Sequence, residues 1–156
     1  RPTTDFAKES LFNILNNLID LENLEALDLF AGTGSIGLEF ISRGAKRVEM
    51  VEKNFIHCNF IKKIIQELNI KNASVIKSDS FIYLKKVKKK YDLIFADPPY
   101  DLNNFKTIPP LVLQSELLNP HGLFIIEHPK TVDFSSIEEF LNSRNYGGVH
   151  FSFFRK

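Results

Sequence analysis

The sequence predicts an α/β fold in which a mostly parallel sheet is covered by helices on both faces. Apolar strand-like runs alternate with amphipathic helical stretches along most of the chain, which is the pattern of parallel strands joined by crossover helices. Tyr146-Gly147-Gly148-Val149 predicts a tight hairpin between two final strands, and this hairpin adds an antiparallel member. With 156 residues and no linker, repeat or low-complexity tract, residues 1–156 are expected to form one domain.

The individual elements follow from hydrophobic periodicity and from capping residues. Thr4 and Asp5 cap an opening helix that is expected to reach Ile19. Asn54 opens a long helix in which apolar residues repeat at helical spacing, namely Ile56, Phe60, Ile64 and Leu68. Further helices are expected over 35–43, over 81–86, in the segment that leads through Leu118, and over 135–142. Strands are expected over 25–30, 47–51, 73–77, 91–96, 122–127, 143–146 and 149–154.

Composition excludes several classes of protein. The chain is 44% hydrophobic and 25% charged, as ordinary globular domains are. No apolar run approaches the length of a membrane span, and no signal-peptide pattern opens the sequence. Cys58 is the only cysteine, which excludes a disulfide framework or a cysteine zinc site within one chain. The four histidines show no metal-ligand spacing, so no metal is predicted. A reduced, cytoplasmic setting is the expectation.

A glycine-rich turn follows the first predicted strand. Gly32, Gly34 and Gly37 fit the G-x-G-x-x-G pattern between a strand and a helix. Glycines let the backbone approach a ligand, and a helix amino terminus offers free N–H groups. Glu52 follows Gly32 by twenty positions at the end of the next strand, where an acid accepts hydrogen bonds from a ribose diol. Together these features predict a site for a nucleoside-containing cofactor.

Asp28 bears on which cofactor binds. It lies four positions before Gly32, where a pyrophosphate would meet like-charge repulsion, so a dinucleotide is disfavoured. S-adenosylmethionine instead carries an ammonium group that pairs with a carboxylate. The small size of the chain agrees, because a dehydrogenase usually needs a second domain for its substrate. The alternative is that Asp28 caps the turn by accepting hydrogen bonds from backbone N–H groups.

The motif Asp97-Pro98-Pro99-Tyr100 ends the buried run 91–96. The prolines stop the strand and bias Asp97 to an extended conformation, so its carboxylate stands at the carboxyl end of a strand. Pro98 and Pro99 carry no N–H, which leaves the carbonyls here less committed to local pairing, and Tyr100 adds a flat ring. Acceptors beside a ring suit a planar amino group, such as the exocyclic amine of a nucleobase. The alternative is a proline-rich turn that only ends a strand.

The charge pattern supplies a candidate nucleic-acid contact. The formal net charge is only +1, but five lysines crowd one short segment before the 91–96 strand: Lys85, Lys86, Lys88, Lys89 and Lys90. This lysine cluster is a candidate for phosphate contacts. The alternative is an ordinary solvated face.

Four stretches carry a family resemblance that covers nearly the whole chain. They are residues 1–5 with Lys8-Glu9 and 11–13, residues 28–39, residues 51–54, and residues 97–100, with weaker matches at 146–147 and 152–154. On these stretches the chain resembles the class I S-adenosylmethionine-dependent methyltransferases, and within them the RsmD-type enzymes that methylate guanine N2 in bacterial 16S ribosomal RNA. The resemblance implies a Rossmann-like fold with a seven-stranded, mostly parallel sheet and a C-terminal antiparallel hairpin. Family members carry a short basic segment ahead of the Arg-Pro-Thr motif, so a natural N-terminal leader is expected to be missing here.

The resemblance also implies roles for individual residues. Those expected at the methionine end of S-adenosylmethionine are Asp28, Ala31, Gly32 and Gly34. Glu52 is expected at the ribose hydroxyls, and Asp79, followed by Ser80, at the adenine amino group. The alternative for Asp79 is a helix N-cap, which does not exclude the first role. Asp97 and the Pro98 carbonyl are expected to accept the hydrogens of guanine N2 while Tyr100 stacks on the base.

The expected partner is small-subunit ribosomal RNA, either free or within an assembling ribonucleoprotein. Related Pro-Pro-Tyr motifs also serve methylation of DNA adenine or cytosine amines and of protein glutamine, so these acceptors are the alternatives within the same chemistry. A nucleotide-binding module without catalysis is the alternative from another class.

Overall fold

The computed structural model describes residues 3–156, which form seven strands and five α-helices. The strands are β1 Glu25–Leu29, β2 Arg47–Glu52, β3 Ala73–Lys77, β4 Tyr91–Ala96, β5 Leu118–His128, β6 Phe140–Tyr146 and β7 Val149–Arg155. The helices are α1 Asp5–Leu18, α2 Ser35–Ser42, α3 Phe55–Glu67, α4 Ser80–Lys86 and α5 Ile108–Leu113, with a short 3₁₀ helix, η1 Phe105–Thr107, before α5. Arg1 and Pro2, which open the family resemblance, lie outside the described residues.

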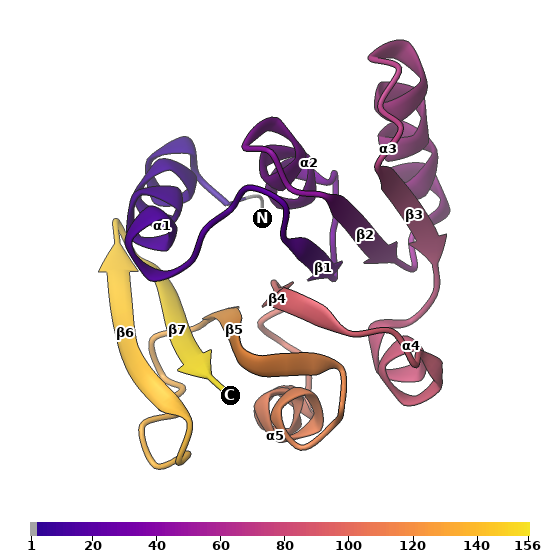
Figure 1. The fold of residues 1–156 in the computed structure, drawn as a ribbon. Helices are drawn as coiled ribbons and strands as arrows, with labels where there is room; N and C mark the ends of the chain where they lie inside the picture. The colour runs from indigo at the N-terminus through magenta and orange to yellow at the C-terminus, as the bar shows by residue number, and fades with distance from the viewer. Residues whose placement is uncertain (1–2) are drawn as a thin grey trace.

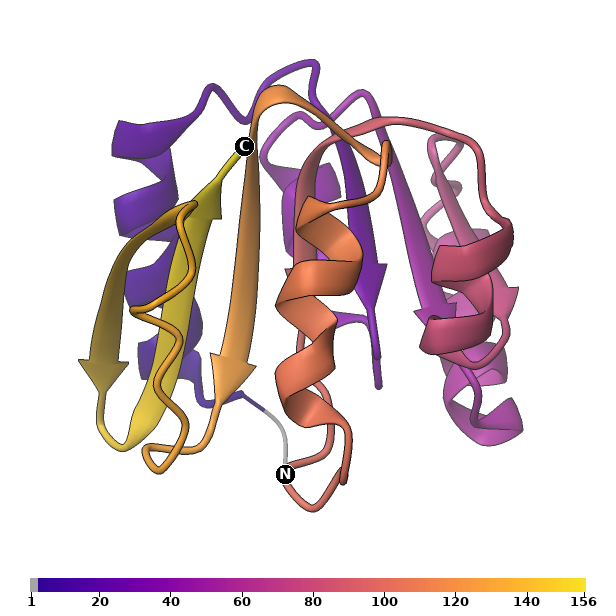
Figure 2. The ribbon, with the colours of Figure 1, turned by 90° about the horizontal axis from the view of Figure 1, so that it is seen from below.

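All seven strands belong to one sheet of order β3-β2-β1-β4-β5-β7-β6. The first five strands run parallel, whereas β7 is antiparallel to both β5 and β6. The predicted mostly parallel sheet with a closing hairpin is therefore confirmed. Helices α1, α2 and α3 cover one face, and α4 and α5 cover the other (Figure 1). The carboxyl ends of the parallel strands all lie at the same end of the sheet, where the β6–β7 turn also lies (Figure 2).

Two apolar layers flank the sheet. The layer under α1 and α2 contains Leu11, Phe12 and Phe40, all fully buried. The layer under α4 and α5 contains Phe124 and Phe154, whose rings stack at 5.5 Å. Burial of side chains of this size contributes about 1.5–3 kcal/mol each, which holds the helices against the sheet. Among residues 3–156, no helix combines the length and apolarity that crossing a bilayer requires.

The predicted helix over 135–142 is wrong. Residues 135–139 form successive turns, with Ile137 N–H donating to Phe134 and Phe140 N–H donating to Ile137. Residues 140–142 instead extend β6, because β7 is long enough to pair as far back as Phe140, opposite Phe154. The few residues that remain are too short for a helix, and the buried Phe134 ring anchors them against Phe154 at 5.9 Å.

Other boundaries also differ from the prediction. The helix expected to lead through Leu118 ends at Leu113, and Leu118 already belongs to β5, which is longer than predicted. The first strand ends at Leu29 rather than residue 30, because Phe30 has φ of 55° and cannot continue a strand. Helix α4 begins at Ser80, one residue earlier than expected.

The apolar row predicted along the second long helix is mostly on the surface. Helix α3 buries Cys58 and Ile61, whereas Ile56, Phe60 and Leu68 are 74%, 49% and 68% exposed. Amphipathic spacing was therefore a correct sign of a helix, but it did not identify the side that faces the sheet.

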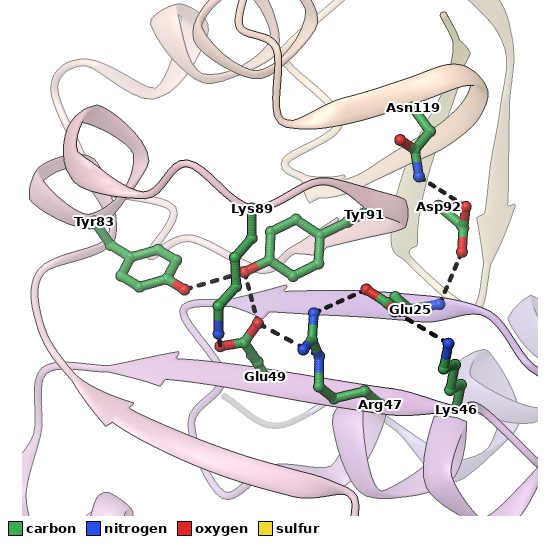
Figure 3. A network of polar contacts seen from close by, with 9 residues as sticks. All are labelled: Glu25, Lys46, Arg47, Glu49, Tyr83, Lys89, Tyr91, Asp92 and Asn119. Carbon is green, nitrogen blue, oxygen red and sulfur yellow. Dashed lines mark hydrogen bonds and ion pairs between the residues drawn. The ribbon is translucent and has the colours of Figure 1, made fainter.

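A polar network ties the amino-terminal ends of β2 and β4 together (Figure 3). Glu49, a buried carboxylate on β2, accepts hydrogen bonds from the Tyr91 hydroxyl at 2.9 Å and from Lys89 Nζ at 3.0 Å. The hydroxyl oxygen of Tyr83, on α4, lies 3.1 Å from the hydroxyl oxygen of Tyr91. Burial raises the pKa of the Tyr91 phenol, so it stays protonated and available as a donor.

Candidate active site

The carboxyl ends of the strands β1 to β4 surround a cavity of about 710 Å³. Its walls come from the turn after β1, the ends of β2 and β3, the start of α4 and the loop after β4. Six residues predicted for the site line it: Gly32, Glu52, Asp79, Ser80, Asp97 and Tyr100. The fold thus brings together residues that are up to 68 positions apart in sequence.

A second cavity of about 250 Å³ adjoins the first. Asp28 and Ala31, both predicted for the methionine end of the cofactor, line it together with Thr3. The two cavities share Phe30, Gly32, His57 and Asp97. Asp97 therefore lies where both cavities meet.

The glycine turn depends on two glycines, Gly32 and Gly37. Gly32 has φ of 58°, which favours glycine, and a Cβ there would meet no atom within 4 Å. Since Gly32 lines both cavities, a side chain at this position would occupy cavity space. Gly37 allows a close approach of α2 to the sheet, because a Cβ there would stand 2.6 Å from the Met50 side chain.

Asp28 is buried at the end of β1. Its Oδ2 accepts a hydrogen bond of 3.0 Å from the Gly37 N–H, so the predicted contact with a backbone N–H is confirmed. Burial raises the pKa of its carboxyl to about 8, the bond from Gly37 opposes the shift, and Asp97 and Glu52 add to it. The Asp28 carboxyl is therefore mostly neutral near pH 7 in the ligand-free chain. A cation bound beside it would favour its ionised form.

Glu52 is held in place by backbone groups. Its Oε1 accepts from the Gly32 N–H and its Oε2 from the Asn54 N–H, both at 2.8 Å. The His57 ring lies further away, with Nδ1 at 3.9 Å from Oε2. Glu52 thus fixes the glycine turn and also lines the larger cavity, where its oxygens can accept further donors.

Asp79 and Ser80 position the start of α4. Asp79 is the N-cap, accepting from the Ile82 N–H at 3.1 Å, so the capping alternative holds. The Ser80 hydroxyl accepts from the Phe30 N–H at 3.1 Å, which fixes the positive-φ residue of the glycine turn. Both residues line the larger cavity, and capping leaves one Asp79 oxygen for a ligand.

Comparison with known proteins decides the family. A family model described as "Conserved hypothetical protein 95" matches residues 1–155. The chain is 35% identical over 133 residues to the Ribosomal RNA small subunit methyltransferase D of Buchnera aphidicola subsp. Baizongia pistaciae, covering 85% of this chain and 67% of that protein. It is 37% identical over 134 residues to the protein of the same name from Haemophilus influenzae, covering 83% and 68%. The chain belongs to the RsmD family of methyltransferases.

Solved structures agree with this family and with the class I methyltransferase fold. A putative methyltransferase, yhhF, from Escherichia coli superposes with a TM-score of 0.88 at 25% identity over 100% of this chain and 87% of that one. A putative methylase from Haemophilus influenzae gives 0.82 at 33% identity over 99% and 98%. The fold is also that of a Thermus thermophilus 16S rRNA N2 G1207 methyltransferase solved in complex with AdoMet and guanosine, with a TM-score of 0.78 at 21% identity over 99% and 44%.

In this RsmD-family chain, the Asp-Pro-Pro-Tyr loop is fixed at both ends. The Asp97 N–H donates to the Leu29 carbonyl at 3.3 Å, which continues the pairing of β4 with β1 by one residue. The Tyr100 hydroxyl donates to Oε2 of Glu127 at 3.3 Å, at the end of β5. Pro98 is buried and does not line either cavity, so the role of its carbonyl stays a prediction.

The lysine cluster lies away from the two cavities. Lys90 directly precedes β4, whereas Asp97 directly follows it, and six strand residues at about 3.3 Å each separate them by about 20 Å. Lys89 donates a hydrogen bond to the buried Glu49. The RNA role of the lysine cluster stays a prediction.

Gly34, predicted for the methionine end of the cofactor, lines neither cavity, because its position faces Ile61 and Met50.

Several residues at the site were not predicted, among them Phe30, His57 and Glu127. Phe30 and His57 line both cavities, and nothing in their sequence context distinguishes them from core or helix residues. Glu127 could have been predicted as a site residue, because it is an acid at the carboxyl end of a strand, as Asp97 is.

Among residues 3–156, no group of three or more His, Cys, Asp or Glu side chains is arranged to hold a metal ion.

Proposed function

We propose that this chain transfers a methyl group from S-adenosylmethionine to the exocyclic N2 of a guanine in small-subunit ribosomal RNA. The observation that carries the proposal is the place of Asp97 at the junction of the two cavities. One cavity system offers room for a nucleoside cofactor, and the Asp97 carboxylate stands where a planar amine would meet it. The names of the RsmD-family relatives support ribosomal RNA as the acceptor.

The residues present fit the cofactor. Gly32 leaves open the space that a side chain would fill, and the acids Asp28 and Glu52 stand at the two cavities. We assign the amino-acid end to the smaller cavity, where the ammonium would pair with Asp28, and the adenosine to the larger one. Glu52 would accept from the ribose hydroxyls and Asp79 from the adenine amine. When bound, S-adenosylmethionine supplies an electrophilic methyl group on a sulfonium centre.

Asp97 and its loop would act on the acceptor base. The lone pair of guanine N2 is delocalised into the ring, so the amine is a weak nucleophile. Hydrogen bonds from N2 to the Asp97 carboxylate and to the Pro98 carbonyl would orient the amine and stabilise the positive charge that develops on it. The N2 lone pair would form a bond to the methyl carbon while the bond between that carbon and the sulfonium sulfur breaks, which leaves S-adenosylhomocysteine. N2, now cationic, would then give up one proton to water. Tyr100 would stack on the base, a contact worth about 1–3 kcal/mol.

The proposal includes the setting of the reaction. The substrate is small-subunit ribosomal RNA, either free or within an assembling ribonucleoprotein, the enzyme acts in the cytoplasm, and residues 1–156 act as one domain without a metal. The name of the Buchnera relative supports ribosomal RNA of the small subunit as the acceptor, and the single sheet supports one domain. Comparing protein-free RNA with RNA bound by small-subunit proteins as methyl acceptors tests which form is used.

Methyl transfer with labelled S-adenosylmethionine tests the activity itself. We expect label in small-subunit RNA and, after digestion to nucleosides, in N2-methylguanosine. Duplex DNA and a protein with exposed glutamines serve as competing acceptors. Label in adenine, cytosine or glutamine would reassign the acceptor, and an absence of transfer with intact cofactor binding would favour a non-catalytic module.

A further inference from the structure

The charge of this chain is unevenly distributed. Residues 53–90 contain ten of the 20 Lys and Arg residues but only two of the 19 acids, a net charge of +8, which leaves −7 for the rest of the chain. This segment forms α3, β3 and α4, which surround the β3 edge of the sheet (Figures 1 and 2). The nearly neutral total therefore conceals one strongly basic edge.

Exposed apolar side chains gather on the same segment. Of the seven large apolar side chains exposed among residues 3–156, five belong to it: Phe55, Ile56, Phe60, Leu68 and Ile82. Ile56 and Phe60 are one helical turn apart on α3, and Lys63 lies on the same side one turn further. The surface thus alternates lysines with rings and aliphatic groups.

The basic edge begins at the active site. Lys53 and His57, at the start of α3, line the larger cavity. Phe81, at the start of α4, lines it as well. Lys62 on α3 lines a shallow groove together with Ser74 and Val75 of β3, and Lys77 is the last residue of β3. A polymer whose target base enters the cavity can therefore continue onto the edge.

One residue of the lysine cluster, Lys89, contacts the core of the protein. Lys89 Nζ lies 3.0 Å from the buried Glu49, which anchors residues 85–90 to the sheet (Figure 3). Its neighbours Lys85, Lys86, Lys88 and Lys90 are exposed. The cluster and α3 thereby form two parts of one basic surface around β3.

We propose that this β3 edge, marked by Lys53, Phe55, Phe60, Lys62, Lys77 and Ile82, binds the single-stranded RNA that flanks the target guanine. Its lysines contact phosphates, and its exposed rings stack on bases, which is the combination that single-stranded nucleic acid requires. A protein partner would cover the apolar groups equally well, but ten basic against two acidic residues match a polyanion. This inference rests on the proposed function, because it supposes that the acceptor is RNA.

The test compares matched charge reversals by their effect on RNA affinity across a salt series. The edge variant is Lys62→Glu with Lys77→Glu, and its control is Lys46→Glu with Arg144→Glu, which reverses two likewise exposed basic residues outside the segment. The probe is protein-free small-subunit ribosomal RNA. We expect the edge variant to bind about tenfold or more weakly at low salt, with a salt slope smaller by about 0.7 for each lost contact. S-adenosylmethionine binding by both variants verifies that they are folded.

Truncation of apolar groups gives a second comparison. Phe60→Ala on the edge is matched by Leu141→Ala, an exposed apolar residue on β6. Loss of one stacked base predicts at least about fivefold weaker RNA binding for Phe60→Ala alone. The inference is overturned if edge and control variants bind RNA equally, or if Phe60→Ala changes only the sedimentation of the protein, which would identify a protein interface. Failure of the proposed function is separate, because then the unaltered chain forms no N2-methylguanosine.

Discussion

The Tyr100 hydroxyl donates a hydrogen bond of 3.3 Å to Oε2 of Glu127, a fully buried carboxylate at the end of β5. The other oxygen of Glu127 accepts from the Thr3 hydroxyl at 2.7 Å. One carboxylate therefore joins the start of the chain, the end of β5 and the loop after β4. The orientation of the Tyr100 ring depends on this buried acid as well as on its own loop.

Two substitutions at Tyr100 separate the ring from its hydroxyl. Tyr100→Phe keeps a stacking surface but removes one donor from the buried Glu127, so we expect a stability loss of about 1–3 kcal/mol and a modest fall in methyl transfer. Tyr100→Ala removes the ring, and we expect kcat/KM for RNA to fall by at least about fivefold more. Denaturant unfolding and steady-state kinetics measure the two effects. Equal activity of the Phe and Ala variants would show that the ring does not contact the base.

Asp97→Ala is expected to impair catalysis far more than cofactor binding. The proposed partner of this carboxylate is the acceptor amine, and loss of one preorganised acceptor commonly costs about a hundredfold in rate. Single-turnover methyl transfer measures the rate, and calorimetry with S-adenosylmethionine measures affinity. An unaltered rate for Asp97→Ala would mean that the carboxylate is structural and that the proposed mechanism is wrong.

Much of the fold could be predicted because local signals agreed with the tertiary structure. The runs 47–51 and 91–96 are mostly apolar, which is typical of strands covered on both faces, although they include Arg47, Glu49 and Asp92. Thr4, Asn54 and Asp79 all cap helices, as their residue types predict. The errors arose where the structure of a segment depends on residues far away in the sequence. Residues 140–142 have no strand signal of their own and become strand only by pairing with β7. Likewise, the buried side of α3 is chosen by its packing on the sheet, as Cys58 and Ile61 show.

The site was predictable to the extent that its residues stand at strand ends. Asp28 is the last residue but one of β1, Glu52 ends β2 and Asp97 follows β4, and a parallel sheet brings the carboxyl ends of its strands together. The contribution of Thr3 to the Glu127 contact could not be predicted, because it depends on how the N-terminal segment lies on β5. The uneven charge of residues 53–90 is visible in the sequence, but only the sheet order shows that these residues share one edge.

Glu52 is expected to stabilise both the glycine turn and the cofactor. Glu52→Gln keeps an acceptor for one backbone N–H, whereas Glu52→Ala loses the acceptors of both Gly32 and Asn54. We expect weaker S-adenosylmethionine binding in both variants, with the larger loss for alanine, because a charged acceptor contributes about 1.5–3 kcal/mol. Calorimetry measures this, with NAD as a control ligand that neither the variants nor the unaltered chain should bind. Tight NAD binding would contradict the cofactor assignment.

Asp28 is expected to make both stability and cofactor binding depend on pH. Its pKa is about 8 in the folded, ligand-free chain against an ordinary 3.8, so between these values the unfolded chain has lost a proton that the folded chain keeps. The stability of the ligand-free chain should therefore fall as the pH rises from about 4 to about 8, and Asp28→Asn should remove this part of the slope.

The proposed ammonium of the cofactor reverses the preference of Asp28, because a cation beside the carboxyl favours its ionised form. Binding near neutral pH must then release a proton, and S-adenosylmethionine affinity should rise between about pH 6 and pH 7.5, by at most about tenfold per pH unit. Calorimetry in two buffers of different ionisation enthalpy counts the released protons directly. Asp28→Asn retains an acceptor for the Gly37 N–H but has no proton to lose, so its binding enthalpy should not depend on the buffer through this group. If the unaltered chain and Asp28→Asn release equal numbers of protons, the ammonium does not pair with Asp28, and the methionine end of the cofactor lies elsewhere.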